Sequence, residues 1–162
     1  DPAERLRERI NSVFWRDDVG FYRDHADDKG YPPVFDSLGH ALAILEGLVP
    51  NSRMDAVVRA FDLAATKFGY RNISPSYPRK ECGQEPERYQ NSAIWPFVHG
   101  YVIGALLKAG LEERARKEFD KFTKLPGFNE WYSPTSGAPM GSHDQLFSAA
   151  LYLRAHDLIS TA

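Results

Sequence analysis

Apolar residues recur along the chain at helical rather than strand spacing. In the segment 2–15, Leu6, Ile10 and Val13 lie three or four positions apart and therefore share one face of a helix. Charged residues occupy the opposite face of this segment. Two further segments carry one apolar stripe amid charged residues in the same way: 52–67 and 111–124. Such amphipathic helices pack one face against a core and expose the other to water.

Three other segments are apolar on nearly every side, which predicts helices that are buried all round. These segments are 37–48, 92–109 and 144–157. Pro96 must lie in the first turn of the second helix, because proline at a later position would break it. Amphipathic and apolar helices alternate along the chain, so we expect an all-α protein built from three αα-hairpins. The amphipathic helices should form an outer layer and the apolar helices an inner one.

The connections between the predicted helices differ in length. Each inner helix is joined to the next outer helix by a few residues, whereas three long connections lead from outer to inner helices: 16–36, 68–91 and 125–143. Long connections without regular structure are uncommon and are often functional. All three should lie on one face, beside the N-termini of the inner helices. The chain then consists of three related units of roughly 50 residues, and this face is the expected functional one.

Composition places the chain among globular proteins and excludes several functions. Its 162 residues are 43% hydrophobic and 26% charged, which suits a single domain over residues 1–162. The net charge of −2 argues against a nucleic-acid partner, and no apolar run is long enough to cross a membrane. The single cysteine, Cys82, excludes an internal disulfide and a cysteine-rich metal site. We expect no metal and no cofactor, and, because no signal peptide is visible, a cytoplasmic location.

Many of the aromatic residues, which make up 13% of the chain, fall in the long connections. The second connection carries Tyr89, Gln90 and Asn91, shortly before Trp95 at the start of an inner helix. Aromatic rings stack on the apolar faces of a sugar, and side-chain amides both donate hydrogen bonds to hydroxyls and accept them. This combination suits a polyhydroxylated ligand. The alternative is that Tyr89 and Trp95 only close the end of the hairpin, and the sequence leaves both interpretations open.

Glu130 is the candidate for catalysis. It lies between Asn129 and Trp131 in the third connection, where aromatic residues and the N-termini of inner helices are expected around it. A carboxylate in such a cleft can act as a general base toward water. A single Glu in a loop rich in Gly and Pro is more often merely exposed, so this second interpretation stays open as well.

The histidines and the acidic pairs of the first connection favour structural roles. His40 and His99 lie on inner helices, where a hydrogen-bonded core histidine is more common than a catalytic one. The pairs Asp17-Asp18 and Asp27-Asp28 are typical of solvated turns. The sequence contains no nucleophile elbow, no phosphate-binding glycine loop and no zinc-protease motif.

Motifs in the second and third connections are shared with a known group of enzymes. The segment YQNSAIWP, which begins at Tyr89, resembles the pattern Tyr-His/Gln-Asn-Gly-x-x-Trp-Pro at the start of an inner helix. The segment from Glu130 to Ser148 resembles the patterns Glu-x-Tyr/Phe, Gly-x-x-x-Gly and Gln-x-Trp-Ser. These patterns belong to the six-hairpin, (α/α)6-barrel glycoside hydrolases. The clan includes trehalases, neutral invertases, processing α-glucosidases, glucosylglycerate and mannosylglycerate hydrolases, and the amylo-α-1,6-glucosidase domain of glycogen-debranching enzymes. The likeness is to the C-terminal half of the barrel and covers the stretches 10–25, 35–50, 69–110 and 128–155.

The resemblance implies both a fold and an activity. The fold is three hairpins that form half of an (α/α)6 toroid, and the activity is an inverting glycoside hydrolase acting on α-glucoside-type sugars. The clan's general base is a Glu in the loop before the last inner helix, which corresponds to Glu130. Ser92 and Phe147 depart from the pattern, because many relatives have Gly and Trp there. The resemblance implies a sugar subsite and surroundings of the base formed by Tyr89, Gln90, Asn91, Trp95, Trp131, Tyr132 and Gln145.

The clan's general acid is an Asp in the other half of the barrel, which this sequence does not contain. The resemblance therefore implies that a second chain or a missing N-terminal half completes the barrel, and that the isolated chain hydrolyses sugars poorly. An open half-ring should also expose the apolar sides of its first and last inner helices. Two alternatives remain open. One is a sugar epimerase or isomerase on a related barrel, with His40, His99 or His143 as acid and base; the other is a non-catalytic helical-hairpin module that binds carbohydrate or protein.

Overall fold

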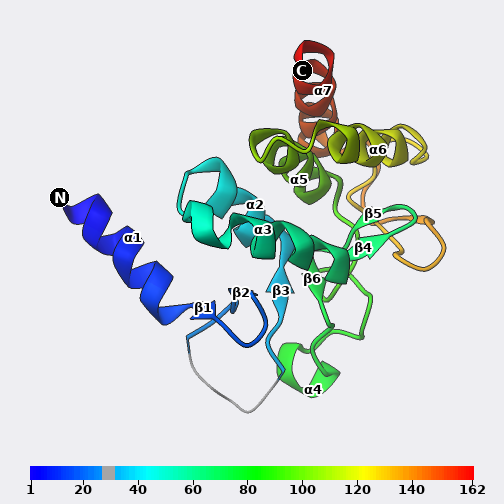
Figure 1. Ribbon diagram of the computed structural model, residues 1–162. Coiled ribbons are helices and arrows are strands. Elements are labelled where there is room, and N and C mark those ends of the chain that lie inside the picture. The colour runs from blue at the N-terminus through cyan, green and yellow to red at the C-terminus, as the bar shows by residue number, and fades with distance from the viewer. Residues whose placement is uncertain (27–31) are drawn as a thin grey trace.

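The computed structural model describes residues 1–26 and 32–162, so the pair Asp27-Asp28 lies outside the described residues. Within these ranges the protein is all-α, with a few very short strands between the helices (Figure 1). The α-helices are α1 (Pro2–Val13), α2 (Ser37–Leu45), α3 (Asn51–Ala60), α4 (Arg79–Cys82), α5 (Pro96–Lys108), α6 (Glu112–Thr123) and α7 (Leu146–Thr161), and a short 3-10 helix, η1 (Phe61–Leu63), continues α3.

The six predicted helices are all present, and their ends differ from the prediction for local reasons. Pro96 is the first residue of α5, as expected, but α5 does not include residues 92–95. Ile94 instead exchanges backbone hydrogen bonds with Tyr132, at 3.1 and 2.8 Å, and therefore belongs to an extended segment. The α3–η1 helix ends at Leu63 rather than at 67, because the next residues form a strand.

The helix α5 lies at the centre of the molecule and packs against α2, α6 and α7 (Figure 1). A Cβ atom placed on Gly100 of α5 would lie only 2.9 Å from the Cβ of Leu151 on α7. Glycine therefore allows the two inner helices to approach each other closely, at the cost that glycine carries in a helix. The largest fully buried side chains include Phe35, Phe61 and Tyr70, which form the core beneath the connections.

Four pairs of two-residue strands lie within or beside the connections. All are antiparallel: β1 (Trp15–Arg16) with β2 (Phe21–Tyr22), β3 (Phe35–Asp36) with β6 (Ile73–Ser74), β4 (Ala65–Thr66) with β5 (Gly69–Tyr70), and β7 (Trp131–Tyr132) with β8 (Pro139–Met140). The β3–β6 pair joins the first connection to the second, and the pairing of Ile94 with Tyr132 joins the second to the third. The three long connections therefore lie side by side at the N-termini of α2, α5 and α7, as the sequence predicts.

The two inner-helix histidines are core residues. His40 and His99 are each the fourth residue of their helix, α2 and α5. A nitrogen of each ring accepts the backbone N–H of a tyrosine in the preceding connection, Tyr22 at 3.0 Å for His40 and Tyr70 at 3.3 Å for His99. The other ring nitrogen of each lies within hydrogen-bond distance of a backbone carbonyl. Burial lowers the pKa of His40 to about 4 and lowers that of His99 as well, so both are neutral at pH 7.

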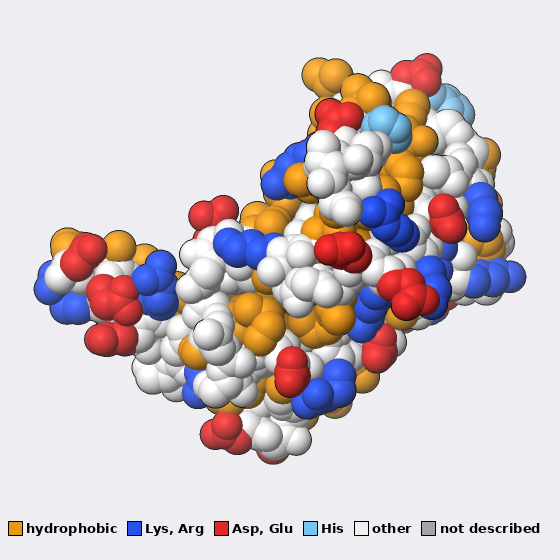
Figure 2. Space-filling model, turned by 45° about the horizontal axis from the view of Figure 1, so that its top comes forward, with side chains coloured by type: hydrophobic (Ala, Val, Ile, Leu, Met, Phe, Trp, Pro, Cys, Tyr) orange, Lys and Arg blue, Asp and Glu red, His pale blue; other side chains and the backbone are white. Residues whose placement is uncertain are grey.

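The two ends of the half-ring are open. No residue of α1 is buried, and the N-terminal part of this helix extends away from the other helices (Figure 1). On α7, Leu146 is 82% exposed and Leu153 is 61% exposed, although the helix is apolar on nearly every side. Figure 2 shows apolar side chains interspersed with charged ones along the upper arm of the molecule, where α7 lies. The expected exposure of the last inner helix is confirmed. No helix among the described residues is long and apolar enough to span a membrane.

Candidate active site

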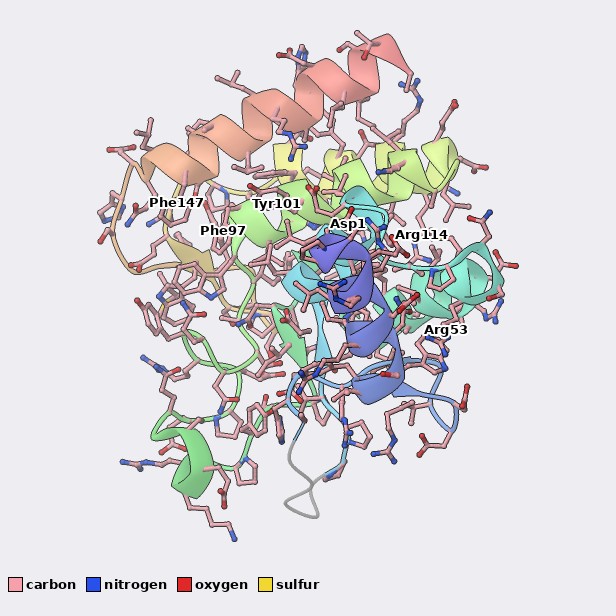
Figure 3. The ribbon with its side chains drawn as sticks, turned by 90° about the vertical axis from the view of Figure 1, so that its left-hand side faces the viewer. Asp1, Arg53, Phe97, Tyr101, Arg114 and Phe147 are labelled. Carbon is pink, nitrogen blue, oxygen red and sulfur yellow. The ribbon has the colours of Figure 1, made fainter. Side chains whose placement is uncertain are left out.

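A pocket of about 490 Å³ opens where the second and third connections meet the starts of α5 and α7. Such a volume is typical of small-ligand sites. Phe97 and Phe147, on the first turns of α5 and α7, lie next to each other at the edge of this pocket, with ring centroids 5.2 Å apart (Figure 3). We call it the Glu130 pocket, and its lining residues are Tyr89, Gln90, Trp95, Phe97, Glu130 and Phe147.

Glu130 is held at this pocket by the turn that follows β8. Its backbone N–H donates to the carbonyl of Ser142 at 2.9 Å, and its Oε2 accepts the N–H of Ser142 at 3.1 Å. Gly141 has a φ of +71°, and a Cβ there would collide with Glu130 Oε2 and lie 2.8 Å from Trp131 Cδ1. Glycine is therefore required at 141 both for the backbone conformation and for the space that the carboxylate occupies. This gives a physical reason for the second glycine of the Gly-x-x-x-Gly pattern.

Three aromatic rings cluster at the pocket, and two of them, Tyr89 and Trp95, line it. The Tyr89 ring meets Trp95 edge to face at 5.0 Å and Trp131 at 6.3 Å between centroids. Trp95 is only 3% exposed, and its Nε1 donates to the Tyr89 carbonyl at 3.0 Å, whereas Tyr89 is 39% exposed. Trp95 therefore both closes the hairpin and supports Tyr89, and Tyr89 presents its ring to the solvent side. The structure thus shows the closing role of Trp95, and a ligand-binding role for Tyr89 stays a prediction.

The Glu130 carboxylate affects the titration of the Tyr89 phenol. The negative charge of Glu130 raises the pKa of Tyr89, and partial desolvation adds to this effect. Tyr89 therefore stays a neutral phenol at physiological pH and can donate a hydrogen bond. Arg88 lies on the second connection, and its guanidinium is 5.9 Å from the centroid of the Trp131 ring.

Three of the residues assigned by resemblance hold the connections in place. The Asn91 Nδ2 donates to the carbonyls of Tyr77 and Gln84 at 2.9 and 3.1 Å, and its Oδ1 accepts the Tyr77 N–H at 2.8 Å. The Tyr132 hydroxyl is fully buried and donates to the Gly127 carbonyl at 2.8 Å. Gln145 directly precedes α7, and its backbone N–H donates to the carbonyl of Phe128. The structure therefore brings Tyr89, Gln90, Trp95 and Glu130 together, with Trp131 behind them.

Sequence reasoning missed Phe97 as a pocket residue. It follows Pro96 directly, and a residue in the first turn of an inner helix must lie close to the connections. The position of Pro96 in the first turn was thus a usable signal. Phe147, noted only as a departure from the family pattern, also lines the Glu130 pocket.

The histidines lie outside the lining of the Glu130 pocket. His40 and His99 use both ring nitrogens in core contacts, and neither lines the Glu130 pocket. His143 lies near Asn129, with its Nδ1 3.1 Å from Asn129 Nδ2. Among residues 1–26 and 32–162, no group of three His, Cys, Asp or Glu side chains is arranged to hold a metal ion.

Comparison with known proteins gives both a family and a fold. The model of the mannosylglycerate hydrolase MGH1-like glycoside hydrolase domain matches residues 1–148. No curated protein sequence matches the chain significantly. Many solved structures do match in fold.

Two of these structures are of the GH63 mannosylglycerate hydrolase from Thermus thermophilus, each with 23% identity and a TM-score of 0.72. The match to the complex with glucose covers 100% of this chain and 41% of the hydrolase chain. The match to the complex with Tris and D-glycerate covers 98% of this chain and 37% of the hydrolase chain. A structure named sialidase has 14% identity and a TM-score of 0.70, and the match covers 99% of this chain and 16% of the sialidase chain. The chain thus spans about two fifths of the hydrolase length.

Proposed function

Because the chain belongs to the mannosylglycerate hydrolase MGH1-like glycoside hydrolase family, we propose that it supplies the general base of an inverting glycoside hydrolase. Glu130 is the proposed base. The observation that carries this proposal is the position of its carboxylate in a pocket formed with Tyr89 and Trp95. A carboxylate beside aromatic rings and a phenol matches the needs of a site that binds a sugar and activates water.

The contacts of Glu130 hold its carboxylate in position for catalysis. The Ser142 N–H fixes Oε2 from the turn, and the Tyr89 phenol interacts with the carboxylate from the pocket. In an inverting reaction the base takes a proton from a water molecule as the water oxygen bonds to the anomeric carbon. The glycosidic bond breaks at the same time, and its oxygen receives a proton from an acid about 6.5–9.5 Å from the base.

The aromatic residues of the pocket suit a sugar ring. Tyr89 presents a partly exposed ring and a neutral phenol, supported from behind by Trp95 and Trp131. The ring can pack against the C–H groups of a sugar, and the phenol and the Gln90 amide can hydrogen-bond its hydroxyls. We propose an α-glucoside-type sugar as the glycone. Asn91, Tyr132 and Gln145 contribute by positioning the connections.

The general acid is proposed to come from the other half of the barrel, either a second chain or an N-terminal half. Two observations support this. The matched hydrolase structures are more than twice as long as the segment that aligns with this chain, as their 41% and 37% coverage shows. In addition, Leu146 and Leu153 leave an apolar face on α7 that another helix would cover.

The stereochemical course of the reaction tests this proposal. The chain is combined with the proposed other half, and we call this complex the assembled barrel. The assembled barrel is given an α-glucoside, and the first product is followed by ¹H NMR before mutarotation. We expect the β-anomer, because water attacks from the face opposite the leaving group. An α-anomer as first product would contradict the assignment of Glu130 as a base that activates water directly.

A further inference from the structure

The turn that carries Tyr89 has a strained backbone. Glu87, Tyr89 and Ser92 have φ values of +61°, +48° and +80°, so three residues other than glycine adopt the left-handed conformation between positions 87 and 92. A side chain makes this conformation unfavourable, and it persists only where the surrounding contacts hold it. We call residues 87–92 the Tyr89 turn. Its geometry must therefore depend on the contacts that fasten it.

One set of contacts fastens the Tyr89 turn to neighbouring parts of the chain. The Tyr89 carbonyl accepts the Nε1–H of Trp95 at 3.0 Å. The Ser92 hydroxyl donates to the carbonyl of Ile73 at 2.7 Å. These partners belong to the second connection or to the residues that lead into α5. They therefore hold the shape of the turn, but they do not tie it to Glu130, which lies on the third connection.

The carboxylate of Glu87 ties the turn to the third connection. Its Oε2 accepts the hydroxyl of Thr135, which lies between β7 and β8, at 2.7 Å, and its Oε1 accepts Nη2 of Arg71 at 2.6 Å. The backbone of Arg71 is fixed in turn, because its N–H donates to Ala64 and its carbonyl accepts the Ser37 hydroxyl. Thr135 and Arg71 both lower the pKa of Glu87, so the carboxylate is charged at neutral pH. We call the contact between Glu87 and Thr135 the Glu87 clamp.

The Glu87 clamp adds to a link that the backbone already makes between the same two connections. Ile94 and Tyr132 exchange backbone hydrogen bonds at 3.1 and 2.8 Å. Links at two separate points restrain rotation of one connection about the other, which a single link would allow. Tyr89 lies between the two links on the second connection, and Glu130 directly precedes β7 on the third. The clamp should therefore set the position of the Tyr89 ring relative to the Glu130 carboxylate.

We propose that Glu87 is a positioning residue, which clamps Thr135 and thereby holds Tyr89 at the Glu130 pocket in the orientation that binds substrate. This inference rests on the proposed function, because it assigns Glu87 a part in the same reaction. Glu87 is not among the residues that line the pocket, so it acts through Tyr89. Without the clamp the turn populates several orientations, and the apparent affinity for substrate falls by the fraction that remains competent.

Thr135→Val tests the clamp without changing a charge. Valine has the shape of threonine but no hydroxyl, and position 135 is exposed, so the free energy of unfolding should change little. Thr135→Ser keeps a hydroxyl and is the matched control. NMR titration of ¹³C-labelled tyrosine measures how far Glu130→Gln lowers the pKa of Tyr89 in each background. We expect Thr135→Val to reduce this lowering about twofold or more, and Thr135→Ser to preserve it.

A second pair of variants compares two glutamates of the same connection. Glu87→Ala removes the clamp, whereas Glu85→Ala removes an exposed ion pair to Arg79 that is also 2.6 Å long but joins no other connection. In the assembled barrel, Glu87→Ala should raise KM about fivefold or more and leave kcat within about twofold. Glu85→Ala should change neither constant. A wild-type KM in Glu87→Ala, or the same rise in Glu85→Ala, would overturn the proposal.

The titration separates this proposal from that of Glu130 as base, because it does not require catalysis. A Tyr89 pKa that responds to Glu130→Gln equally in Thr135→Val and in wild type would overturn the clamp and leave the role of Glu130 untouched. Hydrolysis that does not depend on Glu130 would contradict the proposed function, and the titration would still decide whether the clamp positions Tyr89.

Discussion

The carboxylate of Glu130 accepts the backbone N–H of Ser142 at 3.1 Å, across a turn that contains Gly141. This single contact links the loop sequence to the proposed chemistry, because it fixes one oxygen of the carboxylate at the turn. The turn exists in this form only because residue 141 has no side chain.

Gly141→Ala should therefore reduce activity more than it reduces stability. A methyl group at 141 collides with the Glu130 carboxylate and forces it to move. We expect kcat/KM of the assembled barrel to fall at least 100-fold, with about 1–2 kcal/mol lost in the free energy of unfolding from the positive φ. The measurements are steady-state hydrolysis and urea unfolding.

Gly47→Ala is the matched control. Gly47 has a φ of +65°, but a Cβ there meets no atom within 4 Å. This variant should lose only the stability that the positive φ costs, and it should keep its activity. Equal losses of activity in the two variants would show that strain, rather than displacement of Glu130, causes the effect.

The phenol of Tyr89 should report the charge of Glu130. The carboxylate raises the pKa of Tyr89, so Glu130→Gln should bring this pKa back toward its ordinary value near 10. NMR titration of ¹³C-labelled tyrosine measures the change. Glu113→Gln, on the exposed face of α6, serves as the control and should leave the titration unaltered. A Tyr89 pKa that Glu130→Gln does not lower would mean that the two groups are farther apart than the structure places them.

Acid should weaken the fold through His40. Its pKa is about 4 in the folded protein and about 6.5 when unfolded, so the unfolded state binds the proton more tightly. The stabilising effect of the neutral ring is fully present above pH 6.5 and is lost as the pH falls toward 4. Linkage puts the loss at roughly 3 kcal/mol. His99 acts in the same direction.

Urea unfolding between pH 7 and pH 4 measures this loss. His40→Gln should flatten the pH dependence, whereas His156→Gln, at an exposed position on α7, should not. An identical pH dependence in His40→Gln and wild type would contradict the assignment of His40 as a neutral core residue.

Substitutions of the neighbouring residues Asn91 and Gln90 should have different effects, one on stability and the other on substrate binding. Asn91→Ala leaves backbone groups of Tyr77 and Gln84 unpaired, so the free energy of unfolding should fall by about 2–3 kcal/mol. Gln90→Ala removes only a pocket side chain. It should raise KM several-fold and change the free energy of unfolding by less than about 0.5 kcal/mol. Comparable destabilisation in both variants would contradict this division.

The sequence predicted the helices well, because each has enough turns to show a clear pattern. It could not predict the ends that depend on distant partners. Residues 92–95 have a composition that suits a helix, but Ile94 pairs with Tyr132 from another connection. Strands of two residues have no periodicity to detect, so β3 and β6 become visible only when the chain is folded.

The site was predictable to a similar extent. The motifs identified Glu130 and Tyr89, and the structure places both at one pocket. Residue type alone could not show that the amide of Asn91 points to backbone groups, since an Asn can serve a ligand or a loop equally well. The contact between Glu87 and Thr135 joins residues 48 positions apart and has no counterpart in the sequence pattern.

The most direct test of the central claim is Glu130→Gln in the assembled barrel, with Glu113→Gln as control. The amide keeps the size of the side chain but cannot take a proton from water. We predict a fall in kcat of about 10²–10⁴-fold with little change in Kd for the α-glucoside, and wild-type rates for the control. A Glu130→Gln enzyme that hydrolyses the substrate within about twofold of the wild-type rate would contradict the account.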